Sequence, residues 1–129
     1  MYVLRYNQGK GYWIMERHKR LPAIFYRSLM GAEPVREWLK ELPPEDRRVM
    51  GFDIATAEFG WPVGMPLCRS LGDGLWEIRS RLDHGRTSRV IFCVNADRMV
   101  LLHGFVKKTR KTPPSELELA RKRQKEIER

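Results

Sequence analysis

Hydrophobic and polar residues alternate along three consecutive segments in the middle of the chain. These segments are residues 75–82, 88–94 and 99–106, and each is rich in β-branched, aromatic or aliphatic side chains. The short segments between them, 83–86 and 95–98, contain Gly, Asp or Asn and fit hairpin turns. The pattern therefore predicts a three-stranded antiparallel meander.

Alternation also divides the first of these segments between two faces of the sheet. One face collects the apolar side chains, which are Trp76, Ile78 and Leu82. The other face collects the charged side chains, which are Glu77, Arg79 and Arg81. We expect helices to cover the apolar face and the charged face to be open.

The register of the two hairpins decides which further residues join the charged face. Pairing of residues near Leu82 with Ser88 places Arg89 on it. If the last residue of the second segment pairs with the first residue of the third, Lys108 emerges there too. A slip of one residue would move a whole strand to the opposite face, so both assignments depend on the register.

Helical periodicity is found on the N-terminal side of the meander. Residues 33–42 have apolar side chains at helical spacing, and Pro43-Pro44 ends this helix and begins a second one. The second helix runs to about Phe59, with Gly60 as its C-cap. We expect the two helices to form a hairpin packed on the apolar face of the sheet.

The outer segments complete a single α+β domain, residues 21–129, with its helices on one face of the sheet. Residues 21–29 form a short apolar run that is typical of a strand. After the meander, Ser115 and Glu118 form a capping box that begins a charged helix reaching Arg129. This helix is marginal alone, so we expect it to dock on the body or on a partner.

Residues 1–20 show no sustained period, and two interpretations of this extension stay open. Met15 is the natural start in the first, which makes the preceding residues a misassigned start or a leader. In the second, the segment is an extra strand or arm that packs against the sheet.

Positive charge is concentrated on the meander and the residues that follow it. The chain carries 25 basic and 16 acidic residues, a net charge of +9. Residues 71–112 hold nine basic and four acidic residues, a net of +5, whereas residues 21–70 hold six and seven, a net of −1. Nucleic acid is therefore the first partner to consider, with a solvated basic surface as the simpler alternative.

The sequence does not favour metal catalysis, NTP hydrolysis or acyl transfer. The three histidines are far apart, the carboxylates of the meander are not clustered, and no Gly-rich phosphate loop or nucleophile elbow is found. Cys68 and Cys93 have neither metal-ligand nor redox spacing. With no signal peptide and no apolar run of membrane length, we expect a cytoplasmic protein with reduced thiols.

A basic site without a metal remains, and it suits RNA cleavage. RNA carries its own nucleophile, the 2′-hydroxyl, so an enzyme needs to orient it, remove its proton and neutralise the phosphorane. Arg79 and Arg89, facing one another, would clamp a phosphate. The general base could be Glu77, His103 or a lysine. An ordinary ion pair between Arg79 and Glu77 explains the same pattern equally well.

Three longer stretches carry a resemblance to a known family. They are FYRSLMGAEPVREWLKEL, GMPLCRSLGDGLWEIRSRL and SRVIFCVNADRMVLLHGFVKKTRKTPPSELELARKR. Together, over roughly residues 23–125, they resemble the phage-derived RelE/HigB-like toxins of bacterial type II toxin–antitoxin systems. The resemblance implies a RelE/ParE-like fold, with two helices packed on an antiparallel sheet. It also implies ribosome-dependent, metal-free mRNA cleavage by an endoribonuclease, and neutralisation by a helix-turn-helix antitoxin encoded beside it.

The resemblance also assigns residues, with no cofactor. The expected catalytic residues are Arg79, Arg89, Lys108 and Glu77, although Glu77 stands where some relatives have Lys. The concentration of positive charge, rather than the resemblance, makes Arg81, Lys107, Arg110 and Lys111 the expected RNA-contacting residues. Lys107 is an alternative to Lys108 as the basic residue after the last strand.

Two other functions remain open from the sequence. A ParE-like relative has the same fold but inhibits gyrase, and a catalytically inactive relative binds only nucleic acid or its antitoxin. The basic cluster on one face favours the mRNA interferase over the ParE-like relative.

Overall fold

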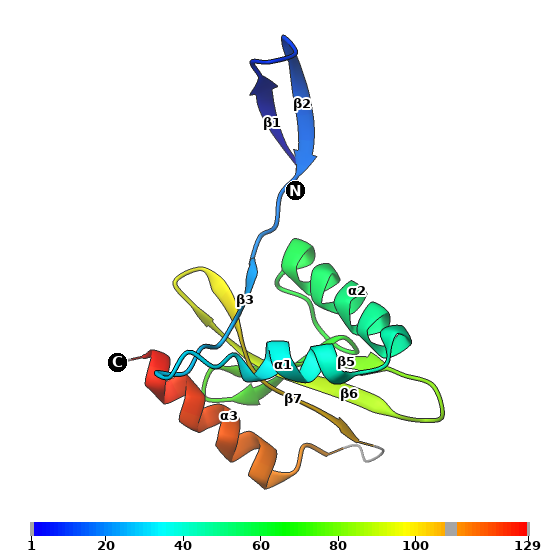
Figure 1. Ribbon diagram of the computed structural model, residues 1–129, viewed down its shortest axis with the longest axis vertical. Coiled ribbons are helices and arrows are strands. Elements are labelled where there is room, and N and C mark those ends of the chain that lie inside the picture. Colours follow the sequence, from blue (N-terminus) through cyan, green and yellow to red (C-terminus); the bar gives the residue numbers. More distant parts are fainter. Residues whose placement is uncertain (1, 108–110, 129) are drawn as a thin grey trace.

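The computed structural model describes residues 2–107 and 111–128, without the side chains of residues 2, 3, 5, 16 and 17 (Figure 1). In chain order the elements are β1 (Tyr2–Asn7), β2 (Tyr12–Arg17), β3 (Ala23–Phe25), α1 (Pro34–Glu41), α2 (Pro44–Gly60), β4 (Cys68–Gly72), β5 (Leu75–Arg81), β6 (Thr87–Asn95), β7 (Arg98–Lys107) and α3 (Pro114–Ile127). Among the described residues, no helix combines the length and the apolar character needed to cross a membrane.

The main sheet has five strands in the order β3-β7-β6-β5-β4. The predicted meander is confirmed, because β5, β6 and β7 pair antiparallel in sequence order. The segment that leads into it is also a strand, β4, which forms one edge. The strand expected over residues 21–29 is only three residues long and runs parallel to β7 at the other edge.

Helices cover both faces of the sheet. The predicted α+β class is confirmed, but the expectation that the charged face is open is wrong. One core lies beneath α1 and α2 and includes Val35, Met50, Ile78 and Phe92. A second core lies beneath α3 and includes Leu75, Ile91, Phe105 and Ala120. Figure 1 shows α2 and α3 on opposite sides of the sheet. The charged C-terminal helix docks on the body, as expected, through the small buried side chain of Ala120.

The helices begin at prolines and have no side-chain N-caps. Each of the three helices begins at a proline, whose fixed φ suits the first helical position. The predicted capping box is wrong, because Ser115 lies inside α3 and no side chain caps that helix. The predicted cap at Gly60 is also wrong: Gly60 is the last helical residue, and its φ is not positive.

The register of the first hairpin confirms which residues share a face. Arg79 lies directly opposite Arg89, and Ser80 rather than Leu82 lies opposite Ser88. This two-residue difference leaves every side chain on its predicted face, since the side-chain period of a strand is two.

The second hairpin contains a β-bulge that changes which basic residue at the end of β7 joins the charged face. Val94 pairs with Met99 as predicted, but β7 carries one extra residue, Leu102, opposite the step between Ile91 and Phe92. Beyond this bulge Lys107 pairs with Thr87. The bulge therefore brings Lys107 to the charged face in place of Lys108, which lies outside the described residues.

The N-terminal extension forms a separate two-stranded sheet. Strands β1 and β2 pair with each other and with no strand of the main sheet. In Figure 1 this hairpin projects away from the rest of the protein. The expectation that this segment adds an extra strand to the main sheet is therefore wrong.

Candidate nucleic-acid interface

A row of three polar residues crosses the end of the sheet. Arg81 on β5 lies opposite Thr87 on β6, and Thr87 lies opposite Lys107 on β7. Neighbouring strands are about 4.8 Å apart, so the three Cα positions span roughly 10 Å. Arg81 is exposed, and Thr87 and Lys107 are half-buried. This row presents two cations and a hydroxyl group to solvent.

Arg79 extends this row where β5 becomes the edge of the sheet. β4 begins at Cys68, opposite Ile78, so it does not cover the following residues of β5. The Arg79 amide instead donates a hydrogen bond of 2.8 Å to the carbonyl of Leu67 in the preceding loop. A cleft of about 580 Å³ opens there, lined by Val49, Asp53, Pro66, Leu67, Arg79, Arg81 and Thr87.

Asp53 is the carboxylate of this cleft, and the sequence reasoning missed it. It lies on α2, 26 residues before Arg79 in the sequence, and is half-buried. No local motif connects it with the meander, since only the packing of α2 against β5 brings the two together. The lining of the cleft thus includes two arginines, one threonine and one aspartate.

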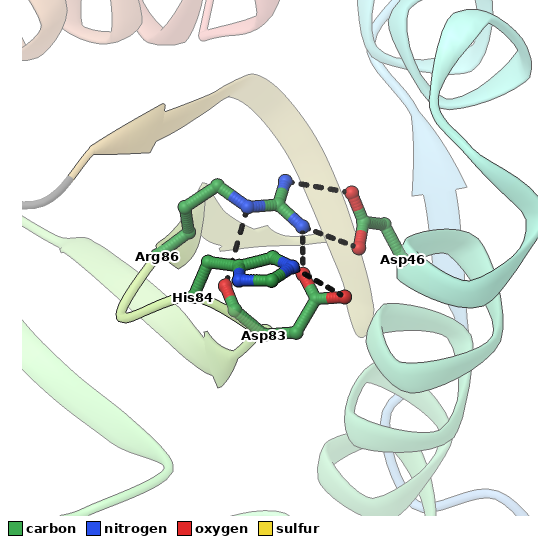
Figure 2. Close-up of polar contacts among 4 residues, drawn as sticks. All are labelled: Asp46, Asp83, His84 and Arg86. Carbon is green, nitrogen blue, oxygen red and sulfur yellow. Dashed lines mark hydrogen bonds and ion pairs between the residues drawn. The ribbon is translucent and has the colours of Figure 1, made fainter.

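An ion-pair cluster fastens the turn between β5 and β6 beside this cleft. Arg86 donates two hydrogen bonds to the buried carboxylate of Asp46 in the first turn of α2, at 2.8 and 3.0 Å. Figure 2 shows that the same guanidinium also contacts Asp83, which holds the pKa of that carboxyl below its usual range. His84 lies 3.9 Å from Asp83. The bidentate pair fixes the position of Thr87, the next residue after Arg86, relative to α2.

Glu77 and Arg89 lie on the predicted face, but both are completely buried. The Glu77 carboxylate accepts a hydrogen bond of 2.7 Å from the Thr112 hydroxyl, and the Arg89 guanidinium lies 3.5 Å from the same hydroxyl oxygen. The expectation that Arg89 stands on an open face is therefore wrong. Arg89 is buried because the residues around Thr112, just before α3, lie over this part of the sheet.

The carboxylate of Glu77 partly compensates the burial of Arg89. Burial lowers the pKa of Arg89; the nearby carboxylate of Glu77 opposes this, while Arg79 and Arg69 act in the same direction as burial. Arg69 on β4 lies directly opposite Glu77 and was also missed from the sequence. Glu77 further contacts Arg79, with 3.7 Å between Arg79 Nε and Glu77 Oε1. The buried pair thus connects to the cleft through Arg79.

His103, a candidate general base, belongs to a different part of the protein. Its Nε2 bonds to Glu116 of α3, and Arg123 lies 3.5 Å from its Nδ1. Arg123 also donates a hydrogen bond of 2.7 Å to the carbonyl of Leu102, the bulge residue. His103 therefore holds α3 against β7 and does not line the cleft.

The remaining expected residues divide into two groups. Lys111 is exposed at the start of the segment leading to α3. Lys108 and Arg110 lie outside the described residues. Over the described ranges, no group of three or more His, Cys, Asp or Glu side chains could hold a metal ion.

Comparison with known proteins identifies a family for this chain. The family model of the phage-derived protein Gp49-like family (DUF891) matches residues 37–125, more than two thirds of the chain. The matched region contains α2, β4 to β7 and most of α3, and so every described residue of the cleft and of the buried pair. No curated protein matches the chain.

Proposed function

Since the chain belongs to the Gp49-like family of phage-derived proteins, a family associated with RelE-like toxins, we propose that it is the toxin of a type II toxin–antitoxin pair and cleaves mRNA on the ribosome. The observation that carries this proposal is the cleft at the end of β5, whose lining includes Arg79, Arg81 and Asp53. The row of Arg81, Thr87 and Lys107 continues the cationic surface beyond it.

The cleft supplies the groups that RNA cleavage by the 2′-hydroxyl requires. Arg79 and Arg81 bind the non-bridging oxygens of the scissile phosphate and stabilise the charge of the phosphorane. The 2′-oxygen bonds to phosphorus, and its proton passes to the carboxylate of Asp53. The bond from phosphorus to the 5′-oxygen breaks, and that oxygen takes a proton from water. The products are a 2′,3′-cyclic phosphate and a 5′-hydroxyl, with no step that needs a metal.

Glu77 and Arg89 act in this proposal as positioning residues. Both are buried, so they hold Arg79 and the segment around Thr112 in place and do not contact RNA. Lys107 and Lys111 bind phosphates on either side of the cleaved bond. A helix-turn-helix antitoxin encoded beside the toxin would neutralise it, and the ribosome places this activity in the cytoplasm.

The test is to map mRNA ends after induced expression of the protein without an antitoxin. We expect growth arrest and new 5′-hydroxyl ends within translated codons. Metal-activated water would usually leave 5′-phosphate ends instead, and such ends on the primary products would contradict the mechanism. Gyrase inhibition with intact message would indicate the ParE-like alternative.

Matched arginine variants make this test specific to the cleft. Arg81→Ala removes an exposed side chain from the cleft, so we expect cleavage to fall by roughly 100-fold or more with unchanged folding. Arg98→Ala removes an exposed arginine at the opposite end of the meander, at the start of β7, and should cleave like the unmodified protein. Equal loss in both variants would show that net charge, and not the cleft, is responsible.

A further inference from the structure

The outer surface of α2 carries a large aromatic side chain that is mostly exposed. Phe52 is 73% exposed, although it lies in the middle of the helix, between Gly51 and Asp53. An isolated exposed apolar residue needs no explanation. Phe52, however, lines a hollow of about 240 Å³ together with Arg48, Val49 and Asp53.

This hollow adjoins the cleft that contains Arg79 and Arg81. Val49 and Asp53 line both spaces, so these two side chains form a shared wall. A strand of RNA whose phosphate lies at the arginines would therefore bring a neighbouring base to the surface of Phe52. The helix supplies this spacing, because Val49 and Asp53 are four residues apart on one face and Phe52 is next to Asp53.

We propose that Phe52 and Arg48 form a stacking site for one nucleobase of single-stranded RNA beside the cleft. This inference rests on the proposed function and adds to it the position of a base. A phenyl ring stacks on any of the four bases, and the guanidinium of Arg48 provides a second flat, cationic surface. The Arg48 guanidinium is oriented by its ion pair with Glu45, at 2.7 Å.

The experiment measures binding of fluorescent single-stranded hexanucleotides to the full chain by anisotropy. Phe52→Ala should weaken binding at least about fivefold for every base composition, the size expected for one lost stacking contact. Phe52→Trp should restore or strengthen binding. Phe52→Leu keeps an apolar side chain without a π-face and should behave like Phe52→Ala. Met30→Ala removes another exposed apolar side chain, 95% exposed and outside both hollows, and serves as the matched control.

Abasic nucleotides separate stacking from an indirect effect on the helix. When one position of the hexanucleotide lacks its base, the difference between Phe52→Ala and the unmodified protein should disappear at that position and persist at the others. A difference that survives at every abasic position would overturn the stacking site. Unchanged binding by Phe52→Ala would overturn it as well.

Failure of the proposed function would look different. If the unmodified protein leaves translated mRNA intact but binds the hexanucleotides with the expected dependence on Phe52, the stacking site stands and the nuclease does not. If it cleaves mRNA but binding is indifferent to Phe52, only the stacking site fails.

Discussion

Arg79 lies directly opposite Arg89 across β5 and β6, yet Arg79 reaches the surface and Arg89 is completely buried. Two like charges in this position destabilise a sheet unless other groups compensate them. Glu77, two residues from Arg79 on the same face, supplies a buried negative charge next to both. Arg79 therefore contributes to the cleft, whereas Arg89 contributes to the interior of the protein.

Arg89→Ala is expected to destabilise the protein by about 3–5 kcal/mol, because it removes a buried positive charge from beside the buried carboxylate of Glu77. Denaturant-induced unfolding measures this change. Arg98→Ala, in which an exposed arginine is removed, should change the free energy of unfolding by less than about 0.5 kcal/mol.

A double variant identifies the cause of that destabilisation. Glu77→Leu combined with Arg89→Met removes both buried charges and should recover much of the stability lost in Arg89→Ala. A loss in the double variant equal to the sum of the single losses would contradict a coupled buried pair.

Asp46 and Arg86 should be energetically coupled, because their bidentate contact joins α2 to the turn between β5 and β6. A double-mutant cycle with Asp46→Asn and Arg86→Ala is expected to give an interaction free energy of about 0.5–3 kcal/mol. Asp83→Asn tests the outer contact of the same guanidinium and should have a smaller effect, since Asp83 is exposed. Additive effects of Asp46→Asn and Arg86→Ala would show that this contact does not stabilise the turn.

Thr112 and Ser115 should respond differently to loss of their hydroxyl groups. Thr112→Val removes the donor to the buried carboxylate of Glu77 and is expected to cost about 1–3 kcal/mol of stability. Ser115→Ala should be neutral within about 0.5 kcal/mol, because Ser115 is exposed inside α3 and caps nothing. A cost of about 1 kcal/mol for Ser115→Ala, typical of a lost N-cap, would contradict the observed start of α3.

The two cysteines should be unreactive in the folded protein. Burial raises the pKa of both Cys68 and Cys93 to about 11, and the carboxylates of Asp53 and Glu128 add to this at Cys68 and Cys93 respectively. At pH 8 a thiol reagent should therefore label them only after unfolding, since the thiolate is the reactive form. Labelling of the native protein at the rate of a free thiol would contradict their burial.

The same shift predicts a dependence of stability on pH. The unfolded thiols have a pKa of about 8.5, so above that pH the unfolded state loses protons that the folded state retains. The stabilisation by the two neutral thiols is complete below about pH 8.5 and is lost as the pH rises to about 11. Replacing both cysteines with alanine should flatten this part of the stability curve.

Alternation and helical spacing were sufficient to predict the meander, the helical pair and the face shared by Arg79 and Arg89. Those features depend on local periodicity and on hairpin parity, which short stretches of sequence contain. The bulge at Leu102 was not predictable in this way, because alternation assumes an uninterrupted register; in the fold, Arg123, 21 residues later, donates a hydrogen bond to its carbonyl. The shift from Lys108 to Lys107 on the charged face follows from that bulge.

The sequence by itself determined which residues are cationic and which face of the sheet they occupy. Only the tertiary structure decided which of them reach solvent. The segment around Thr112 buries Glu77 and Arg89, whereas the late start of β4 leaves Arg79 and Arg81 at an edge, where α2 brings Asp53 and Phe52 beside them. Burial depends on the packing of segments far apart in the chain, and neither composition nor periodicity encodes that packing locally.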